Sequence, residues 1–332
     1  MTAADTGFRP PGSDSSLCYV RLFGWLMLAT TAAWLVTNYL SNSQQWPRAT
    51  ALFAGDFSWQ TFAQWVIFAI PLALAFWYVR KNNTSTLRED AARITAINAY
   101  LIRAAFFTVL LIGLVDTVIS FLRVEDMLEL YFDTDTAKSL SRPQERGANV
   151  HMPLIAASFV LAAFTRSLCF PWLALLIVVA ELLIVITRFI FSYEQAFMGD
   201  LVRFWYASLF LFASAYTLLQ EGHVRVDVFY AGMANRSKGI VNAIGALLLG
   251  MTLCWTILIL GLGAKTSIIY SPLANVEVSQ SGFGSFTKYL MAGFLAVFAI
   301  TMLIQFVAQL FEAVADYREE PGNREIDASA AH

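Results

Sequence analysis

Apolar residues gather in long runs along this chain, separated by short polar segments. A run of about 20 apolar residues, at about 1.5 Å rise per residue, matches the ~30 Å hydrocarbon core of a membrane. A soluble helix would instead carry a narrower apolar stripe and a polar face. The pattern therefore predicts an all-α, polytopic membrane helix bundle of about eight transmembrane helices. The runs lie at about 19–40, 58–79, 97–122, 151–168, 171–192, 203–220, 239–262 and 285–311.

The fourth and fifth runs are almost continuous between residues 151 and 192. Only Thr165-Arg166-Ser167 and Pro171 interrupt them. About 40 residues is roughly twice the length that one membrane crossing needs, and proline breaks the interior of a helix. We therefore expect two helices joined by a tight turn here.

The composition agrees with a membrane protein and excludes most soluble classes. Hydrophobic residues make up 58% of the chain and charged residues 14%, with a mean hydropathy of +0.60. Soluble domains are nearer half apolar and a quarter charged. The net charge of −2 gives no reason to expect a nucleic-acid partner. The polar amino-terminal segment lacks the basic start of a signal peptide, so the first run is expected to be a retained helix.

The distribution of lysine and arginine predicts the orientation in the membrane. With the amino terminus inside, the inner segments carry 12 of these bases and the outer segments 7, while Arg103, Arg188 and Lys288 lie inside runs. Four of the outer bases share the segment 123–150 with six acidic residues. The bias predicts that both chain ends are inside (N-in and C-in), which requires an even number of spans.

Residues with typical catalytic or metal-binding chemistry are few and scattered. The histidines are isolated from one another, at His151, His223 and His332, whereas a di-haem bundle needs paired ligands at mid-membrane depth. The cysteines are odd in number and lie in or beside apolar runs, at Cys18, Cys169 and Cys254. No C-x-x-C, H-E-x-x-H or phosphate-binding loop is present in the sequence. We therefore expect no catalytic residue, no cofactor and no metal, and a protein that is not an enzyme.

Two acidic residues lie deep inside apolar runs, Asp116 and Glu181. A charge in hydrocarbon is costly, and such short side chains reach the interface poorly. Asp116 therefore calls for a structural partner, on a neighbouring helix or another subunit, or for an ion or proton site; the sequence leaves the role of both acids open. The spans are mostly unbroken, whereas transporter sites usually bring interrupted helices, so the chain resembles a scaffold more than a pump.

A short polar turn after the sixth run alternates charged and apolar residues, because 221–227 reads Glu-Gly-His-Val-Arg-Val-Asp. The fifth run ends in Arg-Phe-Ile-Phe at 188–191, a loop with acids covers 192–200, and the next helix opens Arg-Phe-Trp at 203–205. Two long helices complete the chain. In this order the segments resemble the small membrane subunit (DctQ type) of tripartite ATP-independent periplasmic (TRAP) transporters. The resemblance covers about residues 170–315.

The resemblance implies a small permease subunit with four helices in the bacterial cytoplasmic (inner) membrane. Its partner would be a large membrane permease subunit that holds the sodium and substrate sites, and a periplasmic binding protein would deliver the substrate, generally an organic acid. The small subunit would brace the scaffold of the large one. The implied partner-interface or fold residues are Arg188, Glu194, Arg203, Glu221, His223, Arg225 and Asp227. For the last four, a solvated turn that only sets the topology stays an alternative.

The sequence departs from the family pattern in two places. Tyr193-Glu194-Gln195 replaces the tryptophan and paired acids of the first loop, and a typical small subunit has nothing like residues 1–165. We expect four parts: a polar tail at 1–18, an extra membrane region of about four helices at 19–168, a four-helix DctQ-like region at 169–315 and a polar tail at 316–332.

Two other functions stay open. A self-sufficient secondary transporter or channel would require Asp116 and Glu181 to line a water-filled path. A membrane anchor for a redox or other enzyme complex would reveal itself by the visible absorption of bound haem. The sequence carries no indication of the transported substrate, because in the family it resembles the binding protein and the large subunit select it.

Overall fold

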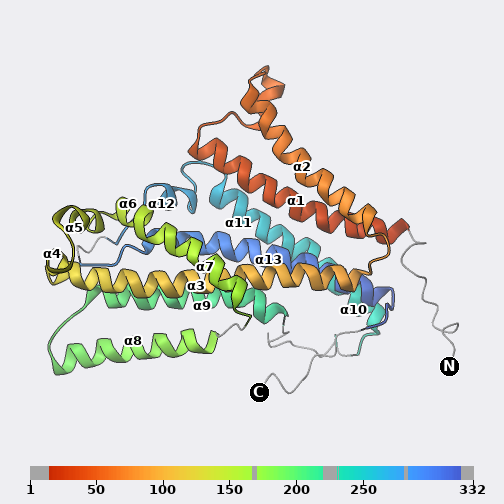
Figure 1. Ribbon diagram of the computed structural model, residues 1–332. Coiled ribbons are helices and arrows are strands. Elements are labelled where there is room, and N and C mark those ends of the chain that lie inside the picture. The colour runs from red at the N-terminus through yellow and green to blue at the C-terminus, as the bar shows by residue number, and fades with distance from the viewer. Residues whose placement is uncertain (1–14, 167–169, 220–229, 231, 280–282, 323–332) are drawn as a thin grey trace. The chain divides into compact units, whose positions relative to one another are not determined.

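The computed structural model describes residues 15–166, 170–219, 230, 232–279 and 283–322 (Figure 1). Within these residues, eight helical segments are long and apolar enough to cross a membrane, which confirms the eight predicted runs. The elements are α1 (Ser15–Ser43), η2 (Ala49–Ala54), α2 (Trp59–Lys81), α3 (Leu87–Val124), α4 (Leu128–Tyr131), α5 (Thr134–Leu140), α6 (Pro143–Arg146), η3 (Gly147–His151), α7 (Met152–Phe164), α8 (Phe170–Ile190), α9 (Ala196–Leu219), α10 (Asn235–Ile244), η4 (Gly245–Met251), α11 (Thr252–Leu262), α12 (Tyr270–Ala274) and α13 (Lys288–Tyr317).

The expected break between the fourth and fifth spans is confirmed. Helix α7 ends at Phe164, where Thr165 takes an extended backbone, and α8 begins at Phe170. Helices α6, η3 and α7 follow one another without a gap, so the fourth span begins at Pro143, earlier than the predicted residue 151. Proline at the first position of α6 suits this start, because its fixed φ fits a helix and its missing N–H is not needed there.

Helix α3 extends beyond the predicted run at 97–122. It begins at Leu87, and its first turn carries Glu89 and Asp90, which interact favourably with the positive end of the helix dipole. Hydropathy alone does not register this extension, because the added turns mix charged and apolar residues. The segment before the fourth span, predicted as a loop, likewise contains two short helices, α4 and α5.

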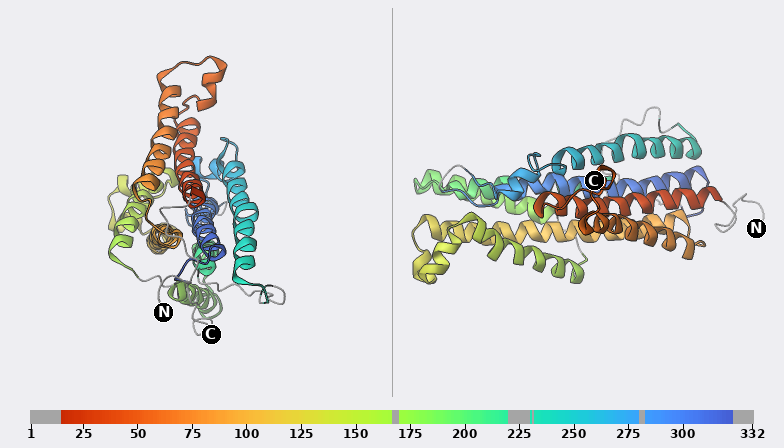
Figure 2. Two further views of the ribbon diagram at one scale, coloured as in Figure 1. Left: turned by 90° about the vertical axis from the view of Figure 1, so that its right-hand side faces the viewer. Right: turned by 90° about the horizontal axis from the view of Figure 1, so that it is seen from above.

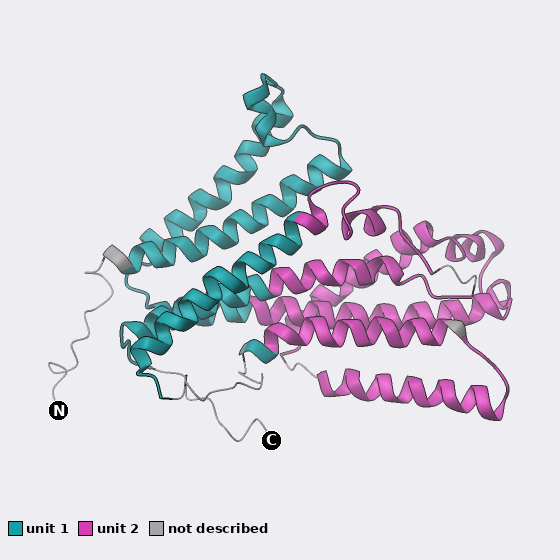
Figure 3. Ribbon diagram, turned by 180° about the vertical axis from the view of Figure 1, so that it is seen from behind, with its two compact units in different colours: residues 1–97, 217–259, 302–332 teal, residues 98–216, 260–301 magenta. Residues whose placement is uncertain are grey.

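The chain forms two compact units, and each combines segments that are distant in sequence (Figure 3). Unit 1 consists of residues 1–97, 217–259 and 302–332, and unit 2 of residues 98–216 and 260–301. Neither unit is one continuous half of the chain, and α3, α9, α11 and α13 each contribute to both. The predicted domain boundary at residues 168 and 169 stays a prediction.

In unit 1 a buried ion pair joins α1 to the first turn of α3. Arg21 Nε donates to Asp90 Oδ2 at 2.7 Å, and both side chains are almost completely buried. Arg21 also donates to the backbone oxygen of Asn82 at 2.8 Å, and Trp25 Nε1 donates to Asp90 at 3.1 Å. The carboxylate thereby has a charged and a neutral donor, as a buried charge requires. This pair fixes the α2–α3 turn against α1.

In unit 2 the carboxy-terminal part of α3 lies in the core of the helices that follow residue 170. Gly113 of α3 lies directly under the indole of Trp205 on α9, and Trp205 Nε1 donates to the backbone oxygen of Val109 at 3.2 Å. A side chain at position 113 would displace the indole. The buried members of this core are Phe106, Val109 and Ile112 of α3, Leu173, Ile177 and Ala180 of α8, Phe197, Met198, Leu201, Val202, Phe204, Trp205 and Phe212 of α9, and Phe294 of α13.

Candidate functional site

Three of the predicted interface residues line one cavity in unit 2. Arg188 at the end of α8, Glu194 in the following loop and Arg203 in α9 surround a space of about 390 Å³. The structure therefore brings together residues that the sequence places up to fifteen positions apart. The other lining residues are Ile184, Tyr193, Gln195, Gly199, Asp200 and Ser279.

A sharp turn after α8 places these side chains. The backbone N–H groups of Phe191 and Tyr193 both donate to the carbonyl oxygen of Thr187, at 3.2 and 3.0 Å, and so end the helix. Ser192 between them adopts a left-handed backbone with φ 52°. Such a residue reverses the chain direction at a helix end. Helix α9 then begins at Ala196. Arg188, near the end of α8, and Arg203, in the first half of α9, therefore lie on either side of the same turn.

The charged groups of this cavity are only loosely held within the chain. Arg188 and Glu194 are 4.0 Å apart, and their side chains are 62% and 77% exposed. Arg203 lies 3.4 Å from Asp200 and is 75% exposed. Exposed pairs of this kind contribute only about 0–1 kcal/mol. The two guanidinium groups and the Glu194 carboxylate therefore remain accessible to another molecule at little cost to the fold.

Asp200 and Tyr193 anchor the cavity to the rest of unit 2. Asp200 Oδ2 accepts a hydrogen bond from the backbone N–H of Ser285 at 3.0 Å, which ties α9 to the segment before α13. The Tyr193 hydroxyl donates to the carboxylate of Glu125, just beyond α3. That hydrogen bond raises the pKa of Tyr193 to about 12, because the Glu125 carboxylate stabilises the neutral phenol. The tyrosine that departs from the family pattern thus holds the loop to the extra amino-terminal region.

The remaining four predicted interface residues, Glu221, His223, Arg225 and Asp227, lie outside the described residues. Their roles stay predictions.

Asp116 lies at the centre of a buried polar network in unit 2. Its Oδ1 accepts hydrogen bonds from Arg146 Nη1 at 3.0 Å and from His151 Nε2 at 3.2 Å. Its Oδ2 accepts from the backbone N–H of Phe286 at 3.0 Å and from the hydroxyl of Ser120 at 3.4 Å. The side chains of Asp116, Ser120, Arg146 and His151 are completely buried. The carboxylate is therefore surrounded by donors from α3, from the start of the fourth span and from the segment before α13.

The network extends from Asp116 to two arginines and a tyrosine. The ring of Phe286 has the guanidinium of Arg146 over it at 4.1 Å and that of Arg123 at 4.3 Å. Arg123 donates to the backbone oxygen of Gly284 at 2.6 Å, and His151 Nδ1 lies 2.7 Å from the Tyr289 hydroxyl. These contacts join residues 116–151 to residues 284–289. The arrangement neutralises charge inside the unit and fixes three chain segments to one another.

Sequence reasoning singled out Asp116 but missed its partners. Arg146 was counted among the four bases of the segment 123–150, and His151 was interpreted as an isolated histidine. The available signal was Pro143, which suits the first position of a helix and would have started the fourth span early enough to include both bases.

Glu181, the other intramembrane acid, lies in a different environment. It is the twelfth of the 21 residues of α8 and its side chain is exposed. Among the residues that the structure describes, it has no hydrogen-bond or ion-pair partner. Asp116 and Glu181 therefore do not line a common path within unit 2.

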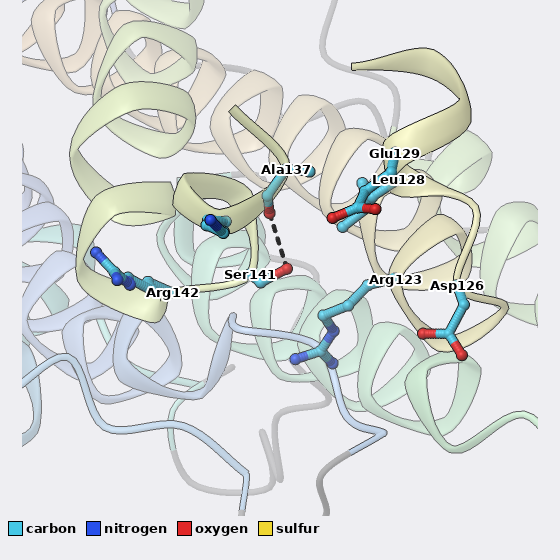
Figure 4. Close-up of a pocket in the computed structure, with 8 residues that line it drawn as sticks. Arg123, Asp126, Leu128, Glu129, Ala137, Ser141 and Arg142 are labelled. Carbon is cyan, nitrogen blue, oxygen red and sulfur yellow. Dashed lines mark hydrogen bonds between the residues drawn. The ribbon is translucent and has the colours of Figure 1, made fainter. Parts of the chain in front are cut away.

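A second cavity, of about 570 Å³, lies over the short helices after α3 (Figure 4). Asp126 and Glu129 lie on one side of Arg123, and Arg142 lies on the other. The Ser141 hydroxyl donates to the backbone oxygen of Ala137 at 2.9 Å and so stabilises this wall of the cavity. Both acids and bases line this space, so its charge favours no single class of ligand. Across the described ranges, no group of three or more potential ligand side chains is placed to hold a metal ion.

Comparison with known proteins identifies the carboxy-terminal part of the chain. Residues 174–316 match the family model of the DctQ component of tripartite ATP-independent periplasmic transporters. Comparisons with curated proteins and with solved structures found no match. The resemblance over about residues 170–315 is thereby confirmed, because residues 174–316 are similar to the DctQ component of this transporter family. The additional helices α1 to α7 precede this domain.

Proposed function

We propose, from the DctQ domain at residues 174–316, that this chain is the small permease (scaffold) subunit of a TRAP-type secondary transporter. The assembled transporter takes up organic acids with a sodium gradient, in the bacterial cytoplasmic membrane. The large permease subunit carries the sodium and substrate sites, and a periplasmic binding protein delivers the substrate. The family match is the observation that carries this proposal.

The geometry of the membrane helices favours a scaffold role over a transport role. Transporter sites commonly use interrupted helices whose free backbone groups bind the ion or substrate. Here α8 and the long helix α13 are continuous, and the π-helical segments η3 and η4 join their neighbouring helices without a gap. The rival function as a self-sufficient transporter needs Asp116 and Glu181 on one water-filled path. Asp116 is instead buried among donors, and Glu181 lies on the exposed face of α8.

The cavity at the α8–α9 connection is the proposed contact with the large subunit. Arg188, Glu194 and Arg203 are charged, exposed and only weakly engaged within the chain. Glu221, His223, Arg225 and Asp227 are proposed to make the corresponding contact at the opposite membrane face.

Transport activity tests the proposal directly. Purified alone in proteoliposomes, the chain should move no organic acid under a sodium gradient, because the proposed ion and substrate sites are on another subunit. Addition of the large permease subunit and the binding protein should produce uptake. Liposomes that hold the large subunit and binding protein without this chain are the matched control. Sodium-driven uptake by this chain alone would contradict the proposal and favour a self-sufficient transporter.

The proposed orientation, with both ends in the cytoplasm, is open to labelling. In a cysteine-free background, single cysteines at the exposed positions Asn83 and Ser237 should react only with a reagent that enters the cytoplasm. Cysteines at the exposed positions Asp135 and Asn275 should react with a membrane-impermeant reagent from outside. The positive-inside bias is the physical reason. Labelling of positions 83 and 135 from the same side would exclude this topology.

A further inference from the structure

Glu181 is a charged residue at the middle of a membrane span. It lies eleven residues from Phe170 and nine from Ile190, the two ends of α8. At about 1.5 Å per residue these separations are roughly 16 and 14 Å, so the carboxylate is far from either end of the helix. Short acidic side chains cannot extend over such a distance, and an ionised carboxylate in hydrocarbon is costly.

Helix α8 is the edge helix of unit 2 (Figures 2 and 3). Only 17% of the most apolar 18-residue stretch of α8 is buried inside the structure. Its buried residues Leu173, Ile177 and Ala180 form one narrow stripe toward α3 and α9. The rest of the helix is therefore available to lipid or to another protein. Lipid suits the apolar residues of this surface but not Glu181.

A second stripe runs along α8 beside the buried one. We define this stripe, the α8 seam, as Ala174, Val178, Glu181, Val185 and Arg188. Its members are spaced four, three, four and three residues apart, which is the heptad spacing of a helix that pairs with another helix. The two valines on either side of the acid are 62% and 48% exposed, and the small alanine lets a neighbouring helix approach closely. At the end of the seam, Arg188 reaches the cavity at the α8–α9 connection.

We propose that the α8 seam receives a transmembrane helix of the large permease subunit, and that an arginine or lysine of that helix pairs with Glu181 at mid-membrane depth. The inference rests on the proposed function and assigns its partner contact. A partner cation neutralises the carboxylate, and its neighbouring apolar residues cover Val178 and Val185. The seam then continues into the cavity lined by Arg188, Glu194 and Arg203, so that one continuous surface serves the whole contact.

A second copy of this chain fits the seam less well. Symmetric dimers place the same surface patch on both subunits, so residues of the seam would meet their own equivalents. Glu181 would then face Glu181, and two carboxylates at close range in hydrocarbon repel each other. A helix with a basic residue would instead neutralise the carboxylate of Glu181.

Site-specific photo-crosslinking locates the partner. A photoreactive amino acid at Val178 or Val185 in the assembled transporter should give an adduct with the large subunit. The matched controls are Val179 and Leu183, which are exposed at the same depth but on the other flank of the buried stripe. Adducts with a second copy of this chain, or with lipid alone, from positions 178 and 185 would overturn the inference.

Substitution of Glu181 separates pairing from folding. Glu181→Leu should lower the yield of the co-purified complex by about tenfold or more, because the partner cation loses its counter-charge. The same variant, purified alone, should be as thermally stable as the wild type or more so, because leucine suits an exposed membrane surface. Glu181→Lys should abolish the complex. Replacement of the crosslinked basic residue of the large subunit with glutamate should then restore it. An unchanged complex yield for Glu181→Leu refutes the seam, whereas wild-type chains that never bind the large subunit refute the proposed function itself.

Discussion

Replacement of Arg146 with alanine should destabilise the protein severely, with a loss of roughly 3–5 kcal/mol in the free energy of unfolding. Asp116 would remain completely buried with its charge and would lose the Arg146 guanidinium, which donates to it from 3.0 Å. Arg146 also donates to the backbone oxygen of Leu140 at 2.6 Å and covers the ring of Phe286, so the same change weakens the start of the fourth span. Thermal unfolding of the purified protein in detergent, followed by size-exclusion chromatography, measures the effect.

Arg142→Ala is the matched control for this prediction. Arg142 lies four residues earlier, is 66% exposed and pairs with Glu145 at 2.7 Å on the surface. Its removal should change the unfolding temperature little. The double variant Asp116→Leu with Arg146→Leu should recover part of the loss, because removal of both charges leaves neither one unpaired. Equal unfolding temperatures for the Arg142 and Arg146 variants would show that the buried network does not support the fold.

The carboxy-terminal fragment from Phe170 onward should not fold by itself, although it contains the whole DctQ domain. Its core lacks Phe106, Val109 and Ile112 of α3, and Trp205 of α9 loses both its place over Gly113 and its hydrogen-bond acceptor. We expect aggregation and a yield of monodisperse fragment at least about tenfold below that of the full chain, since several large side chains lose their packing partners.

Co-expression of residues 1–166 with residues 170–332 provides the control for the fragment. Both pieces then contain their complete helices, and the two should co-purify as one complex with the stability of the intact chain, apart from the covalent link. A fragment from Phe170 that is monodisperse and thermally stable without its companion would mean that α3 packs against an already complete domain.

Hydropathy predicted the membrane helices because each span must bury about twenty residues in hydrocarbon, and that requirement is local. The same reasoning identified the break near Thr165 and the acids Asp116 and Glu181 as exceptions that need an explanation. The extension of α3 to Leu87 was not predicted, because charged residues lower the hydropathy of its first turns, although Leu87, Ala91 and Ile94 are buried there. The Arg21–Asp90 ion pair also stabilises this part of the helix.

The partners of the candidate site residues were beyond sequence reasoning for a different reason. Arg146 follows Asp116 by thirty residues and Phe286 follows it by 170, and no periodicity connects such positions. The cavity lined by Arg188, Glu194 and Arg203 depends on the left-handed backbone of Ser192. A glycine would have indicated such a backbone in the sequence, but a serine does not. By contrast, Arg188 and Arg203 were predicted because they fall on the family pattern, and Glu194 because it is an acid of the loop between them, where the sequence departs from that pattern.

The long separation between Asp116 and its donors has a consequence for the biosynthesis of the protein. Chains are made at about 5–20 residues per second, so Arg146 leaves the ribosome roughly 2–6 seconds after Asp116. The backbone N–H of Phe286, 170 residues later, follows only after roughly 10–30 seconds. During the first interval α3 carries an uncompensated acid, which favours its retention beside the insertion machinery until the fourth span arrives. The last donor therefore closes the network only when the chain is nearly complete.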